Sequence, residues 1–159
     1  MPPAINISAP VKTSHEHYQW IQKVYVMLDD YDRMILEEYQ LNTSQYRTLL
    51  LLDDECGERL TTISDRLLLS KSTITRVIDE LEYRNWVKRI PDPEDRRALR
   101  VVLTPLGLKK KKIVCDAHQQ ALDEVFQTLD RHQQEQLDGL LKSLYSCLQL
   151  SMDGNLTGN

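Results

Sequence analysis

The side chains best suited to chemistry in this chain are arginines and short hydroxyls that follow one another between positions 70 and 100. The first group comprises Ser70, Lys71, Ser72, Thr73, Thr75 and Arg76. Short hydroxyl side chains let a helix backbone come close to a DNA groove, and an arginine can donate two hydrogen bonds to guanine. Ser70 and Lys71 stand where the N–H groups of a helix start and a cation would meet phosphate. This group predicts contact with duplex DNA.

These residues are expected on one helix that starts after Leu69, with Ser70 as its cap, and continues to about Asn85. Its apolar positions form a single stripe at helical spacing: Ile74, Val77, Ile78 and Leu81. The opposite face then presents Ser72, Arg76 and Asp79. An ordinary solvent-facing helix would also carry polar residues there, so the helix alone leaves both interpretations open.

A basic ribbon is expected directly after this helix. Two segments rich in β-branched residues, 87–90 and 99–103, enclose the turn-forming sequence 91–95. Arg89 precedes the turn, Asp95 lies at its tip, and Arg96 and Arg97 follow. A narrow minor groove attracts arginine electrostatically, so the ribbon is expected to touch DNA, with Asp95 holding one arginine by an ion pair. The alternative is a charged edge ribbon that avoids aggregation.

Charge is distributed unevenly along the chain. Residues 59–112 carry 14 Lys/Arg against 7 Asp/Glu, whereas the rest of the chain carries 6 against 17 and the whole chain has a net charge of −4. Because salt screens charges beyond roughly 10 Å, the local cluster decides which surface meets a polyanion. The chain has no glycine-rich phosphate loop, nucleophile elbow or metal-spaced His/Glu cluster, so we expect neither an enzyme nor a cofactor.

The chain is expected to have a mainly α fold with a small β component (α+β) that forms a winged helix-turn-helix. Residues 1–14 are predicted to be a flexible arm, 15–150 a single domain, and 151–159 a disordered tail. Within the domain, 43–104 would form the winged helix that binds DNA, flanked by dimerisation helices at 15–39 and 105–150.

Dimerisation is expected because the terminal helices carry more apolar surface than one small winged-helix body can cover. The positions predicted to pair two chains are Val24, Leu137, Leu141, Leu144 and Leu148. The alternative is that both helices pack within a single chain. In a two-fold dimer, the recognition helices would lie about 34–36 Å apart and contact an inverted repeat.

The chain resembles MarR-type regulators in two segments. Residues 95–104, from Asp95 to Thr104, match the D-x-R-x5-L-T wing signature of that family, and Gly107 stands where the family usually has glycine. Residues 70–82 look like its recognition helix. The resemblance implies a homodimeric winged helix-turn-helix repressor or activator with intertwined terminal helices. It also implies base or phosphate contacts by Ser70, Ser72, Thr73 and Arg76, and insertion of Arg96 or Arg97 into the minor groove.

One departure from the family pattern is Asn85-Trp86, where the family most often ends this helix with glycine. Asparagine tolerates the left-handed conformation, so the turn is expected to survive.

The resemblance further implies a pocket for a small aromatic or anionic ligand between the dimerisation helices and the winged helix. Its candidate lining is Trp20, Tyr25, Tyr31 and Tyr46. An aromatic residue on a helix stripe can equally belong to the core.

Competing functions leave distinct marks on a sequence. A winged-helix adaptor that binds protein and not DNA is the main alternative. A metal sensor built from His15, His17, His118 or His132 is a further alternative, although we predict no metal site.

The chain has three cysteines, an odd number without C-x-x-C spacing, which disfavours disulfides and a zinc knuckle. No apolar run approaches the ~20 residues that span a bilayer, and residues 1–13 lack signal-peptide order, so we expect a cytoplasmic protein without a membrane partner.

Overall fold

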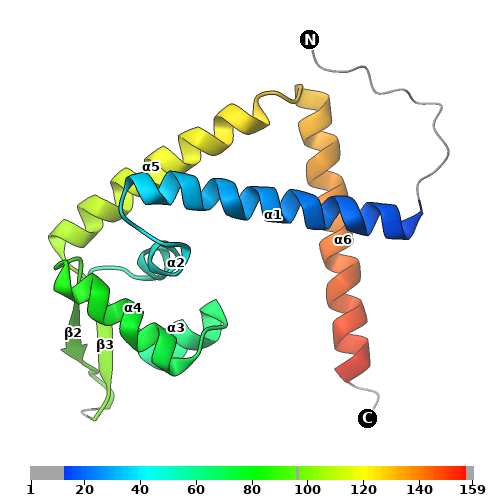
Figure 1. Ribbon diagram of the computed structural model, residues 1–159. Helices are drawn as coiled ribbons and strands as arrows, with labels where there is room; N and C mark the ends of the chain where they lie inside the picture. The colour runs from blue at the N-terminus through cyan, green and yellow to red at the C-terminus, as the bar shows by residue number, and fades with distance from the viewer. Residues whose placement is uncertain (1–12, 96, 157–159) are drawn as a thin grey trace. The chain divides into compact units, whose positions relative to one another are not determined.

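The computed structural model describes residues 13–95 and 97–156 and contains six helices and three short strands in this part of the chain (Figure 1). In chain order these are α1 (Ser14–Glu38), α2 (Thr43–Leu51), β1 (Glu58–Arg59), α3 (Leu60–Leu67), α4 (Lys71–Tyr83), β2 (Val87–Pro91), β3 (Leu99–Leu103), α5 (Pro105–Phe126) and α6 (Arg131–Leu156). The expected mainly α fold with a small sheet is confirmed.

Side-chain caps explain where several helices begin. Asn42 and Gln45 form a reciprocal capping box at α2, with Asn42 Oδ1 2.9 Å from the Gln45 nitrogen. At α4, the Ser70 hydroxyl accepts a hydrogen bond from the Thr73 N–H at 3.1 Å, as the sequence predicted. Pro105 occupies the first position of α5, where its missing N–H costs nothing.

Two helix ends in the winged helix require a left-handed residue. Asn85 follows α4 with φ of 57°, which confirms that asparagine replaces the glycine usual in the family. Leu68, between α3 and α4, has φ of 55° and is 92% exposed. The sequence did not predict this conformation of Leu68, because leucine rarely adopts a left-handed backbone conformation.

The sheet is antiparallel with strand order β1-β3-β2. Val87 pairs with Leu103 and Pro91 with Leu99, so β2 and β3 form the predicted hairpin. Strand β1 was not predicted, because two residues are too short to show an alternating pattern. It pairs Arg59 with Arg100 and thereby joins the start of α3 to the base of the hairpin.

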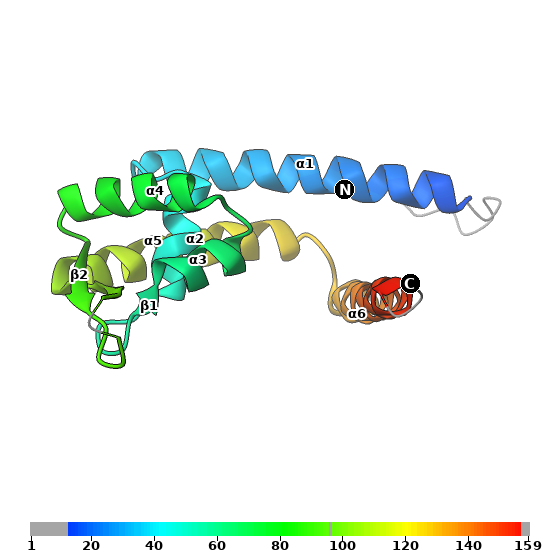
Figure 2. The same cartoon turned by 90° about the horizontal axis from the view of Figure 1, so that it is seen from below.

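One hydrophobic core holds the winged helix together. Its buried members include Leu36, Leu49, Ile63, Ile74, Ile78, Leu81, Val87, Val101, Leu103 and Val114. The whole predicted stripe of α4 is buried, with Ile74, Val77, Ile78 and Leu81 each at most 3% exposed. Because this stripe faces the core, the opposite side of α4 must face solvent. Figures 1 and 2 show α4 packed beside α3, with the β2–β3 hairpin following its C-terminal end.

The described residues form two compact units, one ending at His118 and the other beginning at Gln119, and each is considered by itself. In the second unit, α6 continues to Leu156, five residues beyond the start of the predicted tail at residue 151. Thr13 caps α1 and Ser14 is its first residue, so these two residues of the predicted arm belong to the start of that helix. The remainder of both predicted segments lies outside the described residues.

A turn shaped by Asp53 follows α2. α2 ends at Leu51, and Asp53 folds the following turn by accepting hydrogen bonds from the N–H groups of Glu55, Cys56 and Gly57. These backbone donors, with Gly57 the strongest, lower the pKa of Asp53.

Over the ranges that the structure describes, no helix combines the length and apolar character needed to cross a bilayer.

Candidate nucleic-acid interface

The outer face of α4 carries the predicted DNA-binding residues on exposed positions. Ser70, Lys71, Ser72, Thr75 and Arg76 are exposed, and Thr73 is half-buried. The Ser70 hydroxyl lies 2.9 Å from the Ser72 hydroxyl and 2.7 Å from that of Thr73. These hydroxyls therefore form a small polar cluster at the N-terminal end of α4. The N-terminal end of a helix also concentrates free N–H groups and partial positive charge.

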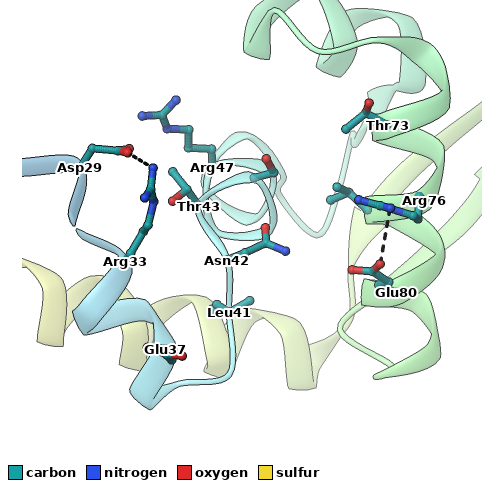
Figure 3. A pocket seen from close by; sticks show the side chains of 12 residues that line it. Asp29, Arg33, Glu37, Leu41, Asn42, Thr43, Arg47, Thr73, Arg76 and Glu80 are labelled. Carbon is teal, nitrogen blue, oxygen red and sulfur yellow. Dashed lines mark hydrogen bonds and ion pairs between the residues drawn. The ribbon is translucent and has the colours of Figure 1, made fainter. Parts of the chain in front are cut away.

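Arg76 is the long donor of this face, with a side chain that is 78% exposed. Its Nε lies 3.7 Å from Glu80 Oε1 one turn later, a loose surface pair that holds the guanidinium only weakly. Arg76 also borders a cleft of about 590 Å³ between α1, α2 and α4. Figure 3 shows Arg76 and Thr73 on one wall of this cleft, with Arg47 and Thr43 on another.

Arg89 is placed differently from the other predicted contacts. Its guanidinium binds Asp79 at 2.6 Å and also binds Glu82, so it joins β2 to α4, and its side chain is only 23% exposed. Asp79 is thus paired with Arg89, whereas Arg76 pairs with Glu80. The two carboxylates hold Arg89 inside the protein, which makes it a support for the wing in this structure.

The arginine-binding carboxylate at the base of the wing is Asp92. Its side chain is fully buried, and Oδ2 lies 2.6 Å from Arg59 Nε and 2.8 Å from Arg100 Nε. Its other oxygen accepts the N–H groups of Glu94 and Asp95. Hydrogen bonds from Arg59 and Arg100 hold the pKa of Asp92 far below its usual range and raise the pKa of both arginines. This buried ion cluster fixes the hairpin against β1.

At the wing tip, Asp95 shapes the turn by hydrogen bonding to backbone. Its Oδ1 accepts the N–H of Arg97 at 3.0 Å, and its carbonyl accepts the N–H of Ala98 at 2.8 Å. The ion pairs at the base of the wing are formed by Asp92 and, more loosely, by Glu94, so the expectation that Asp95 holds an arginine by an ion pair is not met for Arg97. Arg97 is exposed, without an ion pair in the described part of the chain. Arg96 lies outside the described residues.

The sequence analysis did not single out Arg59, Asp92 or Arg100. Asp92 sits in Pro91-Asp92-Pro93, a turn sequence in which aspartate commonly accepts backbone N–H groups two and three residues later. The sequence therefore contained a signal that could have identified Asp92. No local pattern identified Arg59, because its partner Asp92 lies 33 residues away and is reached only through β1.

The four aromatic residues predicted to line a ligand pocket are not equivalent in the structure. Trp20 and Tyr25 are 53% and 62% exposed, Tyr31 is half-buried, and Tyr46 is buried. None of them lines the cleft of Figure 3. Trp20 and Tyr31 stand eleven residues apart on one helix, about 17 Å along its axis. One small ligand would not touch both within a single chain.

Tyr46 instead belongs to a junction between three helices. Its ring lies 5.2 Å from that of His118 on α5, and His118 Nε2 lies 2.9 Å from Asp32 Oδ1 on α1. Burial, followed by the nearby Cys115, raises the pKa of Tyr46 to about 12. This residue is a neutral core phenol at ordinary pH.

The predicted dimerisation residues carry exposed apolar surface. Val24, Leu141, Leu144 and Leu148 are 41–55% exposed, and Leu137 is half-buried.

All three cysteines are free, and Cys56 and Cys147 are exposed. Across residues 13–95 and 97–156, no three His, Cys, Asp or Glu side chains gather in a way that could hold a metal ion.

A helix-turn-helix followed by a β-hairpin, with a polar outward face on its second helix, defines a winged helix-turn-helix protein. The model of the MarR family matches residues 41–99, which contain α2 to α4 and most of the wing. The chain is thus similar to MarR-type proteins over its winged helix.

Similar proteins cover most of the chain. HTH-type transcriptional regulator MhqR of Bacillus subtilis is 26% identical over 122 residues, which is 77% of this chain and 84% of the relative. Transcriptional repressor MprA of Escherichia coli is 28% identical over 131 residues, covering 80% and 74%.

Solved structures show the same fold. A MarR transcriptional regulator from Methanosarcina mazei is 26% identical with a TM-score of 0.68, covering 86% of this chain and 99% of the other. Streptococcus pneumoniae FabT, solved in complex with DNA, is 14% identical with a TM-score of 0.73 over 86% and 98% of the two chains.

Proposed function

We propose that this chain is a transcriptional repressor that binds a specific duplex DNA site through α4 and the wing. The observation that carries the proposal is the exposed face of Ser72, Thr75 and Arg76, placed opposite the buried stripe of α4 and followed by a wing with exposed Arg97. Ser70 and Lys71 would meet phosphates at the start of the helix, and Arg96 or Arg97 would enter the minor groove. The names of relatives such as MprA and the DNA held by FabT support this direction.

The active form in this proposal is a homodimer on an inverted repeat. Exposed apolar side chains on α1 and α6, among them Val24, Leu141 and Leu148, supply surface that a second chain would cover. Two recognition helices related by a two-fold axis would then contact half-sites about 34–36 Å apart. A cytoplasmic location, where such DNA is reached, remains part of the proposal.

The experiment that tests this function is selection of bound duplexes from a random DNA pool, followed by titration of the enriched site at several salt concentrations. We expect an inverted repeat and an affinity that falls steeply with salt, because phosphate contacts release counterions. A chain that enriches no sequence and binds no duplex at low salt would instead support the protein-binding adaptor.

The proposal includes release from DNA by a small aromatic or anionic ligand. Its support is the family resemblance and the aromatic residues of α1 and α2. In a dimer, the exposed Trp20 and Tyr25 would border a pocket with a second chain. Titrating benzoate, a simple aromatic anion, into the protein–DNA complex tests this part. DNA affinity that stays constant up to millimolar benzoate would remove this anion as an inducer.

A further inference from the structure

Tyr83, the last residue of α4, has a nearly fully exposed aromatic side chain. It is 93% exposed, and its phenol makes no hydrogen bond within the described residues. A single exposed aromatic residue is ordinary on a protein surface and needs no explanation by itself. The position of Tyr83 on the helix is what distinguishes it. It borders a shallow hollow together with Arg76 and Asp79, on the face assigned to DNA.

Helix geometry aligns Tyr83 with the predicted groove-reading residues. At about 100° per residue, Tyr83 lies about 180° from buried Ile74. Ser72, Arg76 and Asp79 fall with it in a sector about 60° wide. Tyr83 is thus a fourth member of the outward stripe, which we call the outer stripe of α4.

The length of α4 determines which part of DNA Tyr83 can reach. Tyr83 lies eleven residues beyond Ser72, about 17 Å along the axis, whereas the major groove is about 12 Å wide. If Ser72 and Arg76 reach base edges in the groove, the C-terminal end of the stripe must lie at its rim. Phosphates line that rim, so a phosphate oxygen is the group that this placement would bring opposite Tyr83.

We propose that Tyr83 donates a hydrogen bond from its phenol to a backbone phosphate at the rim of the major groove. This inference rests on the proposed function and extends the interface to the C-terminal end of α4. Tyr83 is a positioning residue here: it fixes how deeply α4 sits and carries no base preference of its own.

The cations Arg84 and Arg89 are engaged within the chain, and Arg76 is assigned to a base edge, which leaves this role to a neutral donor. Arg84 donates a hydrogen bond to the Gln40 carbonyl, and its guanidinium lies 5.0 Å from the centre of the Trp86 ring. Arg89 is held by Asp79 and Glu82. Asp79 and Glu80 would repel a phosphate, so the phenol must supply the local attraction. Among the described residues, Tyr83 is the unpaired hydrogen-bond donor at this end of the outer stripe.

The test is Tyr83→Phe, which removes only the hydroxyl group. We expect binding about 3- to 15-fold weaker on the selected site and equally weaker on random duplex, because a phosphate contact does not distinguish bases. The slope of log affinity against log salt should stay unchanged, since a neutral donor releases no counterion. Tyr18→Phe, which removes an exposed hydroxyl from α1, is the matched control and should bind as the parent does.

Nitration provides a second readout that does not depend on affinity. Tetranitromethane should modify Tyr83 readily in the free protein, and saturating duplex should protect it, as mapped by mass spectrometry. Equal nitration with and without duplex, or parental affinity of Tyr83→Phe, overturns the assignment of Tyr83 while the parent still binds DNA. A parent that binds no duplex overturns the proposed function as well.

Discussion

At the scale of single residues, burial and pairing decide which charged side chains are free to meet a partner. Arg59, Arg89 and Arg100 are occupied by carboxylates of the same chain. Arg76 and Arg97 remain exposed, the first with one loose partner. The basic cluster seen in the sequence therefore divides into arginines that support the wing and arginines that remain available to DNA.

The base-reading role assigned to Arg76 has a direct test. Arg76→Ala should weaken binding to the selected site by about 1–3 kcal/mol and relax the preference at one base position. The matched control is Arg131→Ala on α6, because Arg131 is also exposed and also pairs with a glutamate one turn later, at 2.9 Å. Competition titrations with single-base variants of the site provide the measurement. An equal loss on random duplex would mean that Arg76 touches only phosphate.

At the scale of elements, the wing depends on one buried carboxylate. Asp92→Asn should destabilise the protein at neutral pH, because Arg59 and Arg100 lose their shared anion. The folded-state pKa of Asp92 is lowered, so its contribution is present above the unfolded pKa of about 3.9 and is lost as pH falls below that value.

The difference in unfolding free energy between parent and Asp92→Asn should therefore be largest near pH 7 and shrink below about pH 4. Urea titrations at both pH values measure it. Asp95→Asn, at an exposed position of the same turn, should show a smaller difference. A gap that stays constant from pH 7 to pH 3 would contradict the ion cluster.

The first turn of α5 packs so closely against the backbone of Trp86 that position 107 requires glycine. A Cβ on Gly107 would lie 1.8 Å from the Trp86 carbonyl oxygen, and backbone cannot move aside as a side chain can. Gly107→Ala should cost about 1–3 kcal/mol of unfolding free energy, despite the higher helix propensity of alanine. Gly139→Ala on α6 is the control, because nothing lies within 4 Å of its added Cβ. It should be neutral or stabilising by up to about 1 kcal/mol. Thermal unfolding of both variants decides between these outcomes.

At the scale of the whole molecule, the exposed apolar side chains of α1 and α6 require a covering surface. Deleting residues 130–159 should yield monomers or insoluble chains, because α6 carries Leu141, Leu144 and Leu148. Light scattering of the purified truncated chain measures the mass. A soluble dimer of full stability after this deletion would show that α6 is not the dimer interface.

Much of the fold could be predicted because its patterns are local. The buried stripe of α4, the cap at Ser70 and the left-handed Asn85 each depend on residues within one or two helical turns. The last turns of α6 extend past the predicted start of the tail at residue 151, because helix ends depend on weak competition between turn and helix. Strand β1 was missed because its pairing partner is remote in sequence.

The sequence by itself determined the winged helix and the residue types that face outward on α4, since hydrophobic periodicity and turn chemistry act over short distances. Only the tertiary structure decided which charges are paired. Asp92 binds Arg59 and Arg100 at the base of the wing, and Arg89 is held by Asp79 and Glu82. The reason is physical: an ion pair depends on distance in space, and residues 33 positions apart meet only once β1 has joined the sheet.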